Sequence, residues 1–371
     1  MIDHKHRAHA LLSASSAARW LACPPSAIAA ELYPATDTDY TREGTLAHET
    51  AEAIMRGDPI PQGADAEMIR HAEGYRDYIN SLLETDSSVA LVEQRVDFSP
   101  WVQGGFGTAD CILIQGDTMD VIDYKYGQGV AVAAQGNPQM QLYALGAVND
   151  YGFAYDVSLV RMHVYQPRKD NISVAEVDVK SLLEWADTYV KPRAADAYKG
   201  EGDYRVGSHC TFCPHAGQCR ELTRLCTAYV EDHNGLRHPV DVLAPHEIAE
   251  VLAMEPIVSL WLRKVKAQAL TTMLDGGGIP GYKVVAGRGS RGWDDEIAVA
   301  NALEAAGYGP GEYTETVLLS PAKLEKSIGK KVVAEKLRGH ILKTTGAPTI
   351  APETDKRPAY DREAEALKDF E

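Results

Sequence analysis

The sequence predicts a mixed α/β core, in which helices flank a sheet, followed by a smaller α+β domain. Two stretches near the start, residues 43–57 and 66–85, carry apolar side chains at helical spacing. Residues 89–127 then change to strand-like alternation, with Gly and Asp at the turns. Because a helix and two more strands follow, the order is typical of antiparallel hairpins beside a crossover helix.

The elements of this core can be predicted in order along the chain. A first short helix would be capped by Ser13 or Ser15 and interrupted by Pro24 and Pro25. The helix over 43–57 would end at its glycine, Gly57. Strands are predicted at 89–98, 104–116 and 119–127, a helix at 137–151, strands at 156–167 and 174–179, and a helix at 181–200.

The last third of the chain has a different pattern. Helices are predicted from about residue 243, and a short strand, a basic turn and a helix over 281–307. A basic amphipathic stretch follows, which could dock on a duplex or on a protein partner. The end mixes Pro, Thr and charge, as poorly ordered tails do. We therefore expect a core domain at 1–235, an accessory domain at 236–350 and a flexible tail at 351–371.

Composition sets limits on location and partners. No stretch has the order of a signal peptide, and no apolar run is long enough to span a bilayer, so a cytoplasmic protein without membrane partners is expected. The formal net charge of -16 argues mildly against nucleic acid as a partner, since phosphate contacts need Lys and Arg. Because net charge describes the whole surface, a cleft can still be locally basic.

Three charged residues stand out in the predicted strands. Residues two apart on a strand face the same side, so Asp123 and Lys125 share a face, and a hairpin could bring Asp110 beside them. Carboxylates this close repel each other unless a cation lies between them, and two with water suit Mg²⁺ or Mn²⁺. Such a site could polarise a phosphoryl oxygen. The alternative is that Asp110 caps a turn and the other two form a solvated face.

A second cluster consists of Cys210, Cys213 and Cys219, which fall within ten residues of a cysteine-poor chain. In a reducing compartment, clustered cysteines bind a metal or cluster more often than they form disulfides. Zinc and a 4Fe-4S cluster both accept four thiolates, so the spacing leaves both open. His209 and His215 flank the cysteines and could replace one of them in a zinc site.

Five motifs in order, within roughly the first 226 residues, carry a family resemblance. GTAD at 107–110 and VIDYKYG at 121–127 resemble the signature of the PD-(D/E)XK nucleases. The subgroup they resemble contains the nuclease domains of RecB and AddB and the CRISPR-adaptation exonucleases. Like its members, this chain has a histidine, His48, in a helix before the strands. It also has a Gln-x-x-x-Tyr pair, Gln139 and Tyr143, on the helix after them.

The resemblance implies a restriction-endonuclease-like fold and a metal-dependent DNA nuclease. One or two Mg²⁺ or Mn²⁺ ions would be held by His48, Asp110, Asp123 and the main-chain carbonyl of Tyr124. Lys125 would position a water, activated by the metal, for in-line attack on the scissile phosphate.

The neighbouring residues have structural alternatives. Gln139 and Tyr143 lie one helical turn apart and could simply pack together; the resemblance implies contacts that steady the lysine or the DNA backbone. His48 could be an ordinary helix histidine. Glu93, on the first strand, could add another carboxylate or could be an exposed strand residue.

The resemblance also implies a fourth ligand for the cysteine cluster. Iron-sulfur members of the subgroup place one cysteine before the nuclease core and three after it, and Cys23 matches the first. A 4Fe-4S cluster is therefore favoured over zinc, in a structural role, because four thiolates leave no open position for substrate.

By analogy with the subgroup, the activity would be an exonuclease acting on DNA ends or single strands. It would serve phage or prophage DNA recombination or repair, and a phage recombinase or single-strand annealing protein is a possible partner. The C-terminal region resembles phage and prophage nuclease-like proteins. Two alternatives remain open: a DNA-binding or assembly module that does not cut, and a zinc-stabilised adaptor without a nucleic-acid role.

A Gly-rich loop in the accessory domain collects Arg288, Arg291 and Trp293. Phosphate contact with base stacking is one interpretation. An ordinary hairpin turn with an aromatic plug is the other.

Overall fold

The computed structural model describes residues 10–33, 38–83, 88–127, 129–232, 245–287, 289, 291–314, 319–343, 346–352 and 357–360. The chain divides into two compact units, Met1–Trp261 and Leu262–Glu371, which are treated separately below.

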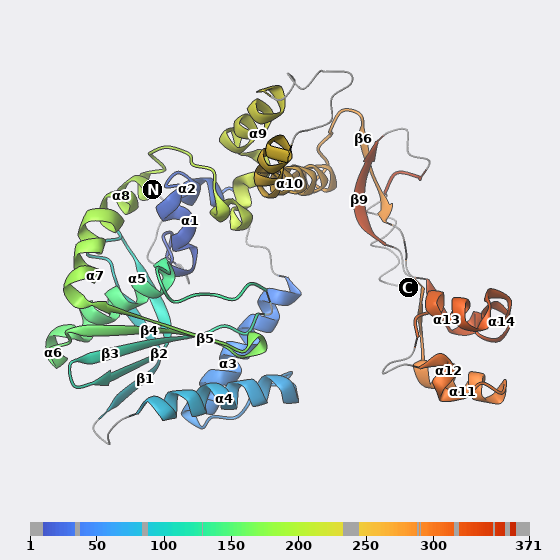
Figure 1. Ribbon diagram of the computed structural model, residues 1–371, viewed down its shortest axis with the longest axis horizontal. Coiled ribbons are helices and arrows are strands. Elements are labelled where there is room, and N and C mark those ends of the chain that lie inside the picture. Colours follow the sequence, from blue (N-terminus) through green and yellow to red (C-terminus); the bar gives the residue numbers. More distant parts are fainter. Residues whose placement is uncertain are drawn as a thin grey trace. The chain divides into compact units, whose positions relative to one another are not determined.

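The first unit is built on a five-stranded mixed sheet (Figure 1). Its strands are β1 (Val89–Asp97), β2 (Phe106–Gln115), β3 (Thr118–Tyr124), β4 (Leu159–Gln166) and β5 (Asn171–Asp178), in that spatial order. Neighbours are antiparallel except β3 and β4, which are parallel and joined through helix α5 (Pro138–Ala147). The predicted strands and the crossover helix are confirmed.

Helices cover both faces of this sheet (Figure 1). Helices α3 (Asp39–Arg56) and α4 (Ala66–Leu82) pack on one face through residues such as Ala51, Ala72 and Tyr75. The other face is covered by α5, α7 (Val179–Trp185) and α8 (Lys191–Lys199), with a π-helical turn at Ala186–Val190 between the last two. This layer also contains η1 (Ala14–Ser16), α1 (Ala17–Ala22), α2 (Ser26–Ala30), a π turn at Val148–Gly152 and α6 (Phe153–Tyr155). The short η3 (Pro167–Lys169) instead contacts α4.

The capping predictions had mixed outcomes. Helix α3 ends at Gly57, whose φ of 74° is the left-handed conformation that glycine adopts without strain, as predicted. At the N-terminus, Ser13 occupies the N-cap position of η1 as predicted, but no Ser side chain makes a capping hydrogen bond to η1 or α1. Instead the main-chain carbonyl of Ser13 accepts a hydrogen bond from Trp20 Nε1 at 3.0 Å, which ties this segment to the buried indole.

The first unit extends beyond the expected core domain. The expected boundary, between residues 235 and 236, lies outside the described residues. Helices α9 (Arg220–Asp232) and α10 (Pro245–Leu274) follow the cysteine segment, and α10 up to Trp261 belongs to the first unit. The reason is packing: Trp261 Nε1 donates to Thr223 Oγ1 at 3.2 Å, and Ile257 and Val258 pack against buried side chains of α9. Assigning 245–261 to the accessory domain was therefore wrong.

The second unit is a small α+β assembly, as expected. Two strand pairs, β6 (Tyr282–Gly287) with β9 (Gly346–Pro352) and β7 (Arg291–Trp293) with β8 (Ile341–Lys343), accompany α11 (Glu296–Ala305), α12 (Pro310–Tyr313), α13 (Pro321–Ile328) and α14 (Lys330–Lys336). Ala351 and Pro352 belong to β9, so the predicted tail begins too early. Of the rest of that tail, residues 353–356 and 361–371 lie outside the described residues.

Within the residues that the structure describes, no helix combines the length and the apolar character needed to cross a membrane.

Candidate functional site

A cavity of about 390 Å³ opens between α3 and the β1–β2 hairpin. Four of the side chains that line it are acidic. Those lining it are Thr45, His48, Glu49 and Glu52 from α3, Glu93, Phe106, Gly107, Thr108 and Asp110 from the hairpin, Tyr143 from α5, and residues 10 and 13–15 of the N-terminal segment.

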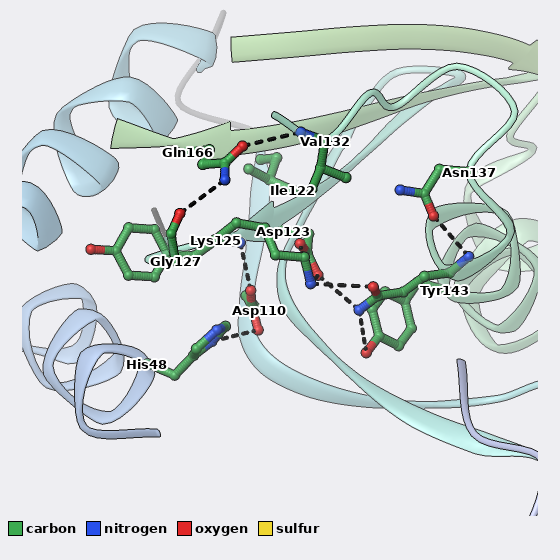
Figure 2. Close-up of polar contacts among 12 residues, drawn as sticks. His48, Asp110, Ile122, Asp123, Lys125, Gly127, Val132, Asn137, Tyr143 and Gln166 are labelled. Carbon is green, nitrogen blue, oxygen red and sulfur yellow. Dashed lines mark hydrogen bonds and ion pairs between the residues drawn. The ribbon is translucent and has the colours of Figure 1, made fainter. Parts of the chain in front are cut away.

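Three possible metal ligands meet in this cavity. One ligand atom each of His48, Glu93 and Asp110 lies within 4.8 Å of the other two. His48 Nδ1 is 3.2 Å from Asp110 Oδ1 (Figure 2). Burial would lower the pKa of His48, but the charge of Asp110 and their hydrogen bond outweigh it and raise the pKa to about 9. Burial and the charge of Asp110 also raise the pKa of Glu93 to about 7.

The backbone of Glu93 is unusual in a strand. Its φ is 51°, in the left-handed region that residues other than Gly, Asn and Asp rarely adopt. The ladder registers Val92 with Cys111 and Gln94 with Ala109, so Glu93 interrupts it opposite Asp110. Strained backbone of this kind tends to cluster at functional sites. Here it accompanies a carboxylate directed toward Asp110 and His48.

Asp123 and Lys125 form a separate pair (Figure 2). Gln139 makes hydrogen bonds with both of them. Lys125 Nζ lies 2.9 Å from Asp123 Oδ2 and donates to Oδ1 at 3.2 Å. The Gln139 amide donates to Asp123 Oδ1 at 3.2 Å, and its carbonyl accepts from Lys125 Nζ at 3.2 Å. Asp123 Oδ2 is buried, and its ionic partner is Lys125 Nζ. Burial raises the pKa of Asp123, although the charge of Lys125 opposes the shift.

The turn of the β2–β3 hairpin brings Asp110 to this pair. Cys111 is registered with Ile122, which places Asp110 opposite Asp123 one step further along. The Tyr124 N–H donates to Asp110 Oδ2 at 2.6 Å. The sequence predicted that the carbonyl of Tyr124 holds a metal; the structure shows its N–H orienting Asp110.

Gly107 leaves room for the Tyr143 ring. A Cβ at Gly107 would lie 2.6 Å from Tyr143 Cε1. With the ring in this position, the Tyr143 hydroxyl accepts a hydrogen bond from Gln139 Nε2 at 3.3 Å. The Gln-x-x-x-Tyr pair therefore connects to both Asp123 and Lys125.

The sequence prediction undervalued Glu93 and omitted Glu49 and Glu52, which also line the cavity. A signal for the latter two was present in helix α3. Glu52 lies four residues after His48 and three after Glu49, and positions three and four apart are neighbours on a helix surface.

The structure brings Cys23 to the segment that carries the other three cysteines. Cys210 lies in η5 (Ser208–Phe212), and Cys213 and Cys219 bracket η6 (Pro214–Gln218). The Arg205 N–H points at Cys23 Sγ at 3.5 Å. Burial raises the pKa of Tyr204, and the charges of Cys219, Cys23 and Cys213 raise it further, so all three lie near its ring.

The four cysteines form no disulfide bonds. All four cysteines are free thiols, and only Cys219 is more than slightly exposed. Among the described residues, only His48, Glu93 and Asp110 form a set of three possible ligands within 4.8 Å, so no three of these sulfurs are that close.

The predicted DNA-contacting residues of the accessory domain have structural partners. Both guanidinium nitrogens of Arg291 pair with the carboxylate of Glu325, and Trp293 Nε1 donates to the Leu319 carbonyl at 3.0 Å. Trp293 also packs on the core of this unit. Trp293 is therefore the aromatic plug of the alternative interpretation, but the loop is not a hairpin turn, because β6 pairs with β9 and β7 with β8. Arg288 lies outside the described residues.

Comparison with known proteins identifies the family. A family model described as "Protein of unknown function (DUF2800)" matches residues 9–358. The chain belongs to the DUF2800 family. A solved structure titled "Crystal structure of SSO0001" is similar at 16% identity over 56% of this chain and 85% of that chain, with a TM-score of 0.26. At that TM-score the likeness supports no conclusion about the fold.

Proposed function

We propose that this protein is a metal-dependent DNA nuclease with a restriction-endonuclease-like core. One observation carries the proposal: the buried Asp123, the half-buried Asp110, a histidine and a lysine converge where the β2–β3 hairpin meets α3 and α5. Lys125 Nζ lies 2.9 Å from Asp123 Oδ2, and His48 Nδ1 lies 3.2 Å from Asp110 Oδ1.

The residues fit a hard divalent cation such as Mg²⁺ or Mn²⁺. Asp110, Glu93 and His48 supply two carboxylates and an imidazole within 4.8 Å of one another. Asp123 adds a buried carboxylate whose Oδ2 lies 2.9 Å from Lys125 Nζ. Such an ion, when bound, would polarise the phosphoryl oxygen and lower the pKa of water. A bound cation would also offset the repulsion among the acidic groups that line this cavity.

Lys125 would act on the phosphate or the attacking water. Its ammonium is fixed by Asp123 and Gln139, so little rearrangement is needed when charge develops on the phosphoryl oxygens. The Gln139 amide would fix the positions of the Asp123 and Lys125 side chains relative to each other. Tyr143 would in turn hold Gln139.

The cysteine site is proposed to hold a 4Fe-4S cluster. Zinc would accept the same four thiolates. The choice of a cluster rests on the resemblance of the cysteine pattern to the iron-sulfur members of the nuclease subgroup. The cluster would have a structural role, because it would join α1 to the segment after α8.

The activity is proposed to be exonucleolytic, in phage or prophage DNA recombination or repair in the cytoplasm. A recombinase or annealing protein that uses the single strands produced would be the partner. These steps rest on the family resemblance of the motifs.

Cleavage of end-labelled DNA tests the proposal. Wild type and Asp123→Asn would be compared on single- and double-stranded substrates with Mg²⁺, Mn²⁺ or EDTA. Metal-dependent cutting that Asp123→Asn abolishes is expected. If folded, cluster-loaded wild type cuts neither linear nor circular DNA, the protein is instead a binding or assembly module.

A further inference from the structure

Beside the metal-binding residues, Arg95 and Phe106 form a pair on the β1–β2 hairpin. The Arg95 guanidinium carbon lies 3.8 Å from the centroid of the Phe106 ring. Phe106 is half-buried and lines the 390 Å³ cavity, whereas Arg95 is exposed. Neither has a role in the chemistry proposed above.

Strand register places this pair within reach of a neighbouring nucleotide. Arg95 lies opposite Thr108, and they are two residues from Glu93 and Asp110 respectively. A strand rises about 3.4 Å per residue, so Arg95 lies roughly 7 Å along the hairpin from those carboxylates. Successive phosphates on an extended strand have a similar separation. A phosphate next to the scissile one could therefore meet the Arg95 guanidinium.

The charges around the cavity favour this assignment. Glu49, Glu52, Glu93 and Asp110 line it, and a polyanion entering it needs a cation at the rim. Arg56, near Glu52, is already paired with that carboxylate. Arg95 pairs with no carboxylate in the part of the chain that the structure describes. It is thus available to a phosphate.

The Phe106 ring indicates which kind of DNA could be bound. A base stacks on an aromatic side chain only when it has left its neighbours, so such a ring serves single strands and frayed ends. The cavity volume falls within the range of small-molecule sites, roughly 300–1,000 Å³. It suits one unpaired nucleotide better than a duplex.

We infer that Arg95 and Phe106 bind the nucleotide next to the scissile phosphate of a single-stranded DNA end. Arg95 contacts its phosphate and Phe106 stacks on its base. The inference rests on the proposed nuclease function and adds the substrate to it.

The test measures binding of a fluorescent single-stranded oligonucleotide by anisotropy, with Ca²⁺ replacing Mg²⁺ to prevent cutting, over a range of salt concentrations. One phosphate contact contributes about 0.7 to the slope of log affinity against log salt for single strands. Arg95→Gln is expected to lower the slope by about 0.7 and affinity about tenfold. Phe106→Leu should lower affinity without changing the slope, because it removes stacking and no charge.

A matched control exists on α8. The Arg193 guanidinium also lies 3.8 Å from an aromatic centroid, that of Tyr189, and neither residue lines the cavity. Arg193→Gln removes the same charge and the same cation–π contact. It should leave both the slope and the affinity at wild-type values.

The outcomes separate the inference from the nuclease proposal. If wild type cuts DNA and Arg95→Gln binds with an unchanged slope, the inference is wrong and the nuclease stands. If binding depends on Arg95 but no metal supports cutting, the inference about binding holds and the nuclease fails. An equal loss in Arg95→Gln and Arg193→Gln would mean a nonspecific charge effect and would overturn the inference.

Discussion

His48 and Asp110 face each other across 3.2 Å, from Nδ1 to Oδ1, although one lies on a helix and the other on a strand. With no metal bound, the charge of Asp110 keeps the imidazole protonated, with a pKa of about 9. A metal ligand must be neutral imidazole. Proton and metal therefore compete for His48.

The first prediction concerns the stability of the metal-free protein at different pH values. The folded pKa of His48, about 9, exceeds its ordinary value of 6.5, so its stabilisation is complete below 6.5 and lost as pH rises through 9. The melting temperature in EDTA should therefore fall over this interval. His48→Gln should flatten this part of the profile. A slope of equal size in both proteins would contradict the assignment.

Glu93→Gln should have opposite effects on stability and metal binding. At pH 8 the carboxylate, with a pKa of about 7, is mostly charged beside Asp110, so the amide should raise the melting temperature in EDTA. Manganese affinity should fall by about tenfold or more, because a ligand charge is lost. Glu73→Gln, an exposed change on α4, is the control for calorimetric titration with Mn²⁺. Unchanged affinity in Glu93→Gln would exclude it as a ligand.

Lys125→Ala should abolish cutting while the fold is retained. Removing the ammonium leaves buried Asp123 without its cation, which should cost up to about 3 kcal/mol in EDTA. Added Mn²⁺ should recover much of the lost stability, because it supplies positive charge beside Asp123. Lys199→Ala, at an exposed ion pair with Glu201, should change neither activity nor melting temperature. Full activity in Lys125→Ala would mean that the active site lies elsewhere.

Gly107→Ala should impair activity by moving Tyr143. The added Cβ would lie 2.6 Å from the ring, which must shift and weaken its hydrogen bond with Gln139. Overpacking of this kind costs about 1–3 kcal/mol, and denaturant unfolding measures it. Gly44→Ala is the control, because no atom lies within 4 Å of its Cβ position. Equal effects of the two changes on cleavage would argue against a role for the Tyr143 position.

Cys23→Ser should remove the same cluster as Cys213→Ser, although the two positions are far apart in sequence. Anaerobic purification followed by iron and sulfide analysis and visible absorption should show loss in both. Each variant should also unfold more easily, since the bound group joins two segments. Cys111→Ser, at a buried thiol in the helix-covered core, should retain full iron content. Zinc in stoichiometric amount, without iron, would replace the cluster proposal.

Much of the core could be predicted because its information is local. Alternation marks β1 to β3, and helical spacing marks α3 and α4, so the places of Asp110 and Asp123 followed from pattern alone. The ends of elements were harder. Ser13 resembles a cap in sequence, but its carbonyl is held by Trp20, a contact that depends on folding.

The sequence by itself determined the order of strands and helices and the closeness of Asp123 to Lys125, because two-residue spacing and a hairpin register settle both locally. Only the tertiary structure decided that Glu93 joins His48 and Asp110, since that depends on a left-handed backbone at Glu93. The meeting of Cys23 with Cys213 likewise depends on the packing of α1 and η5. Contacts between distant segments follow from how helix faces and sheet faces bury apolar area together, and no short stretch of sequence contains that information.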